Sequence, residues 1–116
     1  VFCAITHDGN GQLLNTNADT ITSQVAIGMS KVYKTSIYYC FELEGVLRDI
    51  NDKKSVIRKI NLNTYQELLD AGIITEGMLP KLENCFNALK KGVHEVNLGN
   101  TAMLTNENKN FTTITL

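Results

Sequence analysis

The sequence predicts an α/β fold in which helices pack against a mostly parallel sheet. Short segments rich in β-branched and aromatic residues alternate with segments whose apolar residues recur at helical spacing, in the order β-α-β-α-α-β-β. No linker, internal repeat or low-complexity stretch interrupts this order. A chain of 116 residues can bury one core but not comfortably two, so residues 1–116 are expected to form a single domain.

The N-terminal third predicts a strand followed by a helix. Val1–Ile5 is a continuous apolar run that ends at the turn-forming residues THDGNGQ, which indicates a buried strand and then a loop. Apolar residues at helical spacing indicate a helix over about residues 19–32. Asn17 is suited to its N-cap, and Asp19 lies in the first turn, where the helix dipole favours a negative charge.

The middle of the chain predicts a strand, a loop and a second helix. Residues 36–41 are β-branched and aromatic without alternation, which is typical of a central strand covered on both faces. The charged residues 48–54 indicate a solvent-exposed loop. A helix is expected over residues 64–71, with Asn63 at its start and Gly72 just after its end.

The last third predicts one helix and two strands. The helix begins near Met78, with Pro80 in its first turn, where proline fits without cost, and Gly92 after its last turn. Residues 93–98 and 111–116 have the composition of strands.

Ligands of such sheets bind beyond the carboxyl ends of the strands, which directs attention to the loops at residues 6–19, 42–48 and 72–81. The segment Asn-Thr-Asn-Ala-Asp at 15–19 brings carboxamides and a carboxylate to a helix N-terminus, where free backbone N–H groups attract anions. Helix capping alone would account for the same residues.

Two further positions have a structural and a functional interpretation. Gly45 follows the predicted strand and would let a ligand approach the backbone closely, although a strand-end glycine is more often part of a turn. Lys81 would lie in the first turn of a helix, where the dipole opposes a cation. This indicates a phosphate partner, unless the lysine is merely solvated.

The composition excludes several classes of protein. Eleven Lys and Arg against twelve Asp and Glu give a net charge of −1, which argues against a general nucleic-acid or membrane-surface binder. No apolar run reaches the ~20 residues of a membrane span. Cys3, Cys40 and Cys85 have no CxxC or metal spacing, so they are expected to be reduced core residues of a cytoplasmic protein. His7 and His94 have no neighbours that indicate a metal site.

Four segments together resemble the C-terminal half of the amino-acid kinase family, in its acetylglutamate kinase branch. They are THDGNGQLLNTNAD, FELEGVLRD, AGIITEGMLPKLENCFNALKKGV and FTTITL, in that order. The combination of NxNAD with a later GMxPK is more specific than either motif alone. The resemblance implies a three-layer αβα fold, with this chain as the ATP-binding C-terminal lobe of a longer kinase.

The resemblance also implies an activity and a set of roles. The activity is phosphoryl transfer from ATP, with Mg²⁺, to the side-chain carboxylate of an N-acylated glutamate, a step of arginine biosynthesis. By position, Asp19 resembles the aspartate that orders the catalytic lysines, and Lys81 resembles the lysine that neutralises the phosphates. Asn15 and Asn17 match substrate-binding positions. The stretches that match nucleotide-binding positions are Glu42, Leu43, Glu44, Gly45, Val46, Leu47, Ile73, Ile74 and Thr75.

Some of the family's pattern is missing from these 116 residues. They lack its glycine-rich loop and second catalytic lysine, and Phe111 stands where the family has a glycine. Three interpretations stay open: a lobe of a longer kinase, acting on an acylglutamate or on another substrate such as free glutamate or a nucleotide; a nucleotide-binding module without catalysis; or a fragment that binds nothing. The isolated chain is expected to self-associate through an exposed sheet edge and an uncovered apolar face. The resemblance implies that the longer kinase is a homo-oligomer through its other lobe.

Overall fold

The computed structural model describes residues 1–74, 76–105 and 109–116. Its elements, in chain order, are β1 (Ile5–His7), β2 (Leu13–Asn15), α1 (Ala18–Ser30), β3 (Ser36–Cys40), β4 (Lys59–Ile60), α2 (Leu62–Asp70), α3 (Leu79–Lys90), β5 (Glu95–Gly99), the 3-10 helix η1 (Thr101–Leu104) and β6 (Thr112–Ile114). None of the helices in these residues is long and apolar enough to cross a membrane.

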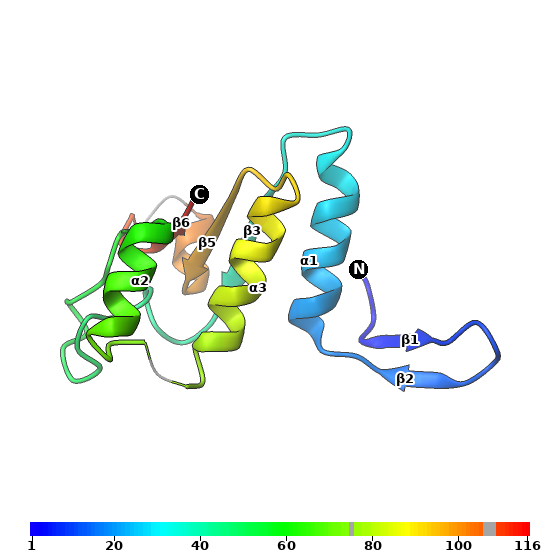
Figure 1. The fold of residues 1–116 in the computed structure, drawn as a ribbon, viewed down its shortest axis with the longest axis horizontal. Coiled ribbons are helices and arrows are strands. Elements are labelled where there is room, and N and C mark those ends of the chain that lie inside the picture. Colours follow the sequence, from blue (N-terminus) through cyan, green and yellow to red (C-terminus); the bar gives the residue numbers. More distant parts are fainter. Residues whose placement is uncertain (75, 106–108) are drawn as a thin grey trace.

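The strands of the described residues form two separate sheets. β1 and β2 make an antiparallel hairpin that extends away from the rest of the molecule (Figure 1). The other sheet has the strand order β3-β5-β6-β4, in which β3 is parallel to β5, β4 is parallel to β6, and β5 is antiparallel to β6. The predicted α/β class with a mostly parallel sheet is therefore confirmed.

Three helices cover one face of the larger sheet. Figure 1 shows α2, α3 and α1 side by side, with α3 in the middle and in front of β3 and β5. The opposite face is covered near its carboxyl end by η1, since the sulfur of Met103 lies 3.1 Å from the point where a Cβ on Gly99 would stand. The result is an αβα arrangement in which, within the described residues, the layer on one side is thin.

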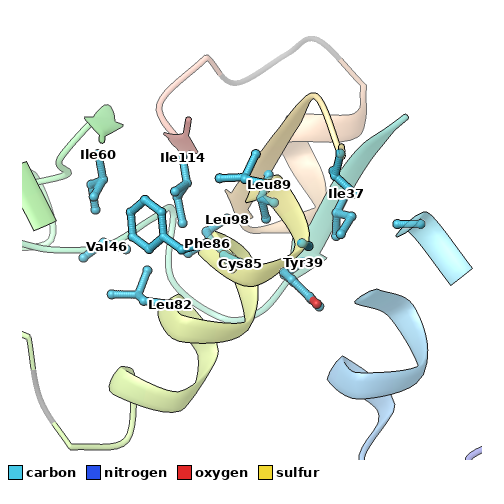
Figure 2. Packing of buried hydrophobic residues seen from close by; sticks show 14 of the residues in the cluster. Ile37, Tyr39, Val46, Ile60, Leu82, Cys85, Phe86, Leu89, Leu98 and Ile114 are labelled. Atoms are coloured by element: carbon cyan, nitrogen blue, oxygen red, sulfur yellow. The ribbon is translucent and has the colours of Figure 1, made fainter. Parts of the chain in front are cut away.

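The core lies between α3 and the sheet (Figure 2). The periodicity of α3 turns one face toward the strands, and this face is almost fully buried at Leu82, Cys85, Phe86, Ala88 and Leu89. The strand residues that meet it are Ile37, Tyr39, Ile60, Val96, Leu98 and Ile114. The ring of Tyr65 on α2 packs against Phe86, with 4.9 Å between the ring centroids, and so joins α2 to the same core.

Several predicted helix boundaries are confirmed by their capping contacts. Asn17 is the N-cap of α1, and its side-chain oxygen accepts a hydrogen bond from the backbone N–H of Asp19. Pro80 lies in the first turn of α3. Gly72 and Gly92 follow α2 and α3 with φ angles of +66° and +105°, which glycine adopts without strain.

The predicted start of α2 is wrong by two residues. Asn61, rather than Asn63, is the N-cap, and its side chain accepts a hydrogen bond from the N–H of Thr64. Both positions in the sequence Asn-Leu-Asn carry a side chain that can cap. The choice depends on the backbone, which is extended at Asn61 because it has just left β4.

Two strand predictions are corrected by the structure. Val1–Ile5 is not a buried strand: β1 covers Ile5–His7, pairs within the described residues only with the short β2, and leaves Val1 and Phe2 exposed. Among the described residues β3 pairs only with β5, at an edge of the sheet, and its residues alternate between buried and exposed because one of its faces is covered rather than both. β2, β4 and η1 were not predicted, because segments of two to four residues carry little periodicity.

Candidate functional site

Lys81 and Asp19, which are 62 residues apart, form an ion pair. The Lys81 Nζ lies 2.6 Å from Asp19 Oδ2, and the two side chains are 26% and 28% exposed. Asp19 is in the first turn of α1 and Lys81 in the first turn of α3. The carboxylate thus offsets the unfavourable placement of a cation at a helix N-terminus, and both charges remain within reach of a ligand.

Tyr39 of β3 lies beneath this ion pair. The Lys81 Nζ is 4.7 Å from the centroid of the Tyr39 ring. The Tyr39 hydroxyl donates a hydrogen bond to the backbone carbonyl of Asp19 at 3.2 Å and lies 3.1 Å from the hydroxyl of Ser23. Burial raises the pKa of Tyr39, the hydrogen bond with Ser23 acts in the opposite direction, and Cys85 and Asp19 add smaller increases, so the hydroxyl is protonated well beyond neutral pH and can donate.

Cys85 lies one turn after Lys81 on the same face of α3. Burial raises the pKa of its thiol to about 12, although the nearby Lys81 acts in the opposite direction. The thiol is therefore neutral, and it packs as a small apolar group rather than serving as a nucleophile. Cys3 and Cys40, by contrast, are exposed, which corrects the expectation that all three cysteines lie in the core.

An apolar pocket of about 180 Å³ lies between the segment that follows β3 and the segment that precedes α3. It is lined by Phe41, Leu43, Gly45, Val46, Leu47, Ile50, Ile73, Ile74 and Met78. Two segments that the sequence separates by more than twenty residues therefore meet here, and most of the positions matched to nucleotide-binding stretches share one pocket. Met78 lies three residues before Lys81, so the first turn of α3 joins the pocket to the ion pair.

The segment that carries Gly45 and Val46 is held against the start of β6. The Thr112 hydroxyl accepts a hydrogen bond from the N–H of Val46 at 2.8 Å and donates one to the carbonyl of Ile57 at 2.7 Å. A Cβ on Gly45 would stand 2.6 Å from the Thr112 Oγ1 and 2.8 Å from a methyl of Val56. Only glycine fits there, which gives Gly45 a packing role in addition to any approach to a ligand.

Other predicted residues lie outside this pocket. Glu42 is exposed and Glu44 is half-buried, with its carboxylate accepting a hydrogen bond from Asn110 at 2.6 Å. Thr75 falls outside the described residues. Asn17 uses its side-chain oxygen to cap α1, and Asn15 lies exposed in β2 opposite Ile5. Among the described residues no hydrogen bond joins the side chain of Asn15 to the ion pair.

Phe111, which was expected to occupy the position of a family glycine, is accommodated by Gly99. A Cβ on Gly99 would stand 2.9 Å from the Phe111 Cβ and 2.8 Å from the Glu44 carbonyl oxygen. The absence of a side chain at Gly99 therefore creates the space that Phe111 needs. The sequence alone did not reveal this contact, because Gly99 ends β5 and Phe111 directly precedes β6, and only the pairing of these two strands brings the residues together.

The residues of the site that were not identified from the sequence are Tyr39, Thr112 and three that line the pocket, namely Phe41, Ile50 and Met78. Each belongs to an element that was predicted or nearly so, but its role depends on contacts with distant segments. The described part of the chain contains no group of three or more His, Cys, Asp or Glu side chains that could hold a metal ion.

Comparison with known proteins supports a family assignment. The sequence profile of the amino acid kinase family matches residues 1–100. Two acetylglutamate kinases are each 50% identical to this chain. The match to the enzyme of Cytophaga hutchinsonii extends over 112 residues, which is 94% of this chain and 42% of that protein. The match to the enzyme of Bacteroides fragilis extends over 96 residues, which is 83% of this chain and 37% of that protein. The chain thus spans about two fifths of the length of these curated relatives.

Solved structures agree with this assignment at the level of the fold. The crystal structure of smu.665 from Streptococcus mutans is 28% identical, with a TM-score of 0.73, and the match covers 97% of this chain and 40% of that one. An N-acetylglutamate synthase structure from Neisseria gonorrhoeae has a TM-score of 0.78 over 97% of this chain and 26% of that one, at 18% identity. The profile match and the sequence identities to the two kinases show that the chain belongs to the amino acid kinase family.

Proposed function

We propose that this chain is the nucleotide-binding lobe of a longer cytoplasmic kinase. The kinase transfers a phosphoryl group from ATP to the side-chain carboxylate of an N-acylated glutamate. The observation that carries the proposal is the Lys81–Asp19 ion pair, which adjoins the apolar pocket through the first turn of α3. A cation beside an apolar pocket suits a ligand with a flat apolar base at one end and phosphates at the other.

The chemistry asks little of the protein beyond position and charge. A glutamate side chain is already ionised at neutral pH, so the attacking oxygen needs no general base. What remains is to align this oxygen with the γ-phosphorus and to neutralise the charge on the phosphates. Lys81 supplies positive charge at the helix N-terminus, and Asp19 holds the direction of its ammonium group.

The two ends of ATP find matching surroundings. Leu43, Val46, Ile73 and Ile74 offer apolar walls for the adenine. The N-terminus of α3 has no side-chain cap, so its backbone N–H groups are open to phosphate oxygens together with Lys81. Mg²⁺ bound together with ATP would be held largely by phosphate oxygens and water.

Calorimetric titration with MgADP tests this proposal directly. We expect the chain to bind MgADP with millimolar or tighter affinity. Lys81→Ala should weaken this binding about ten-fold or more, because a hydrogen bond between a partly buried cation and a phosphate contributes on the order of 1.5–3 kcal/mol to the free energy of binding. Lys90→Ala is the matched control: the same charge is removed from the same helix, at its exposed far end.

Equal weakening by both substitutions would mean that only net charge matters, and the proposed phosphate site would be wrong. Binding that depends on Lys81 without any phosphorylation of an acylglutamate by the longer protein would favour the alternative of a nucleotide-binding module. Phosphorylation of free glutamate but not of N-acylglutamate would assign a different substrate within the family.

A further inference from the structure

Tyr39 contacts both residues of the ion pair, and on each of the two helices it lies beside a pair of residues with the same four-residue spacing. Asp19 and Ser23 are four residues apart on α1, and Lys81 and Cys85 are four residues apart on α3, so each pair lies on one helix face. The Tyr39 side chain extends from β3 toward α1, with its hydroxyl at the helix (Figure 2). One side chain therefore connects the first turns of two helices.

The ring and the hydroxyl of Tyr39 have separate tasks. The Lys81 ammonium lies over the ring, 4.7 Å from its centroid, a distance typical of a cation–π contact. The hydroxyl bonds the backbone carbonyl of Asp19 and the Ser23 side chain, which fixes the first turn of α1 against β3. Tyr39 is only 7% exposed, so its own place is set by the core.

Without the Tyr39 ring, the ammonium group of Lys81 would have no well-defined position. Its side chain has four rotatable bonds, and an ion pair that is about a quarter exposed constrains them only weakly. The Tyr39 ring limits the ammonium from a second direction, and its hydroxyl limits the carboxylate indirectly through the α1 backbone.

We infer that Tyr39 is a positioning residue, which holds the Lys81 ammonium and the Asp19 carboxylate in the arrangement that meets the phosphates of the nucleotide. This inference rests on the proposed function for its phosphate partner. It adds a residue of β3 to a site otherwise formed by the first turns of two helices, and it assigns that residue to the phosphate end of the ligand rather than to the base.

The first test is spectroscopic and needs no ligand. A methylene group held above an aromatic ring has an upfield-shifted proton resonance. We expect the ε-methylene protons of Lys81 to show this shift in the wild-type chain and in Tyr39→Phe, which keeps the ring, and to lose it in Tyr39→Leu. An unshifted Lys81 resonance in the wild-type chain would overturn the inference, whether or not Tyr39→Leu folds.

The second test compares ligands with and without phosphates. Tyr39→Leu should weaken MgADP binding about five-fold or more, in keeping with a cation–π contact of roughly 1 kcal/mol or more, while adenosine binding, followed by saturation-transfer NMR, stays unchanged. Tyr39→Phe should recover part of the loss. In a Lys81→Ala background, Tyr39→Leu should cost nothing further, because the lysine through which Tyr39 acts is gone.

The outcomes separate the two proposals. Equal loss of MgADP and adenosine binding in Tyr39→Leu, or an undiminished loss in the Lys81→Ala background, would show that Tyr39 only supports the fold. A wild-type chain that binds no MgADP but shows the ring-shifted Lys81 resonance would contradict the proposed function of the chain, while the placement of Lys81 by Tyr39 would stand.

Discussion

For Lys81, the sequence predicts the position in its helix but not the residues that contact its side chain. Its place in the first turn of α3 followed from the sequence, and so did the conflict between its charge and the helix dipole. The Asp19 carboxylate that resolves this conflict lies 62 residues away in the chain, and only the family resemblance suggested that the two belong together. Tyr39 could not have been chosen among the aromatic residues of its strand, because its role depends on which neighbour lies above its ring.

Cys85 makes the stability of the fold sensitive to alkaline pH. Its thiol has a pKa of about 12 in the folded chain against an ordinary value of 9.0. Between these values the unfolded chain has lost the proton and the folded chain has kept it, so the free energy of unfolding should fall as pH rises, by at most about 1.4 kcal/mol per pH unit for this group. Burial raises the pKa of Tyr39 as well, which adds a loss of the same sign at higher pH.

Urea unfolding at pH 7, 9 and 10 measures this effect. Cys85→Ala should be less stable at pH 7 but should lose less stability between pH 9 and 10 than the wild-type chain. Parallel pH dependence in the two proteins would show that the thiol ionises as readily in the folded chain as in the unfolded one.

At the scale of elements, α3 and β1 mark the two extremes of predictability. α3 carries a sustained apolar stripe, an early proline and a terminal glycine, and these local signals agree with its environment in the structure. The Val1–Ile5 run has the composition of a buried strand but lies at the exposed start of a hairpin. Strand burial depends on the partner strands and layers, which composition alone does not specify.

The link between β6 and the pocket segment gives a prediction at this scale. Thr112 is fully buried, and its hydroxyl satisfies the N–H of Val46 and the carbonyl of Ile57. Thr112→Val keeps the shape and orphans these groups, so the free energy of unfolding should fall by about 1–3 kcal/mol or more. MgADP binding should weaken too, because Val46, whose N–H bonds Thr112, is one of the residues that line the pocket.

Thr112→Ser is the control for this prediction, since it retains the hydroxyl and removes only a methyl group. Denaturant unfolding and calorimetry on both variants would decide the matter. If the valine variant proved as stable as the serine variant and bound MgADP equally well, the hydroxyl would not be what holds the segment.

At the scale of the molecule, the layered arrangement could be predicted from the alternation of helices and strands. Which strand edge and which apolar side chains are exposed to solvent could not. β3 pairs on one side only within the described residues, and Tyr38 on this edge strand is 46% exposed. Val32, Tyr33 and Phe2 add exposed apolar surface. An unpaired edge beside apolar side chains is a template for association between copies of a chain.

We therefore expect the 116-residue chain to self-associate with rising concentration in sedimentation velocity experiments. Tyr38→Lys, which places a charge on the edge strand, should reduce this association. Tyr33→Lys makes the same change outside any strand and should have less effect. A single monomeric species at all concentrations, or equal effects of the two substitutions, would contradict an edge-mediated contact.

The hydrogen bond between Val46 and Thr112 also has a consequence for the order of events during synthesis. The two residues are 66 positions apart in the chain. The pocket segment around Val46 is therefore held by β6, a strand that the ribosome makes long after that segment. Such distant pairings form late, because the loop between them must be closed first. We therefore expect a nascent chain to complete this wall of the apolar pocket only after Thr112 has emerged, so a ligand of the pocket could not act as an early template for folding.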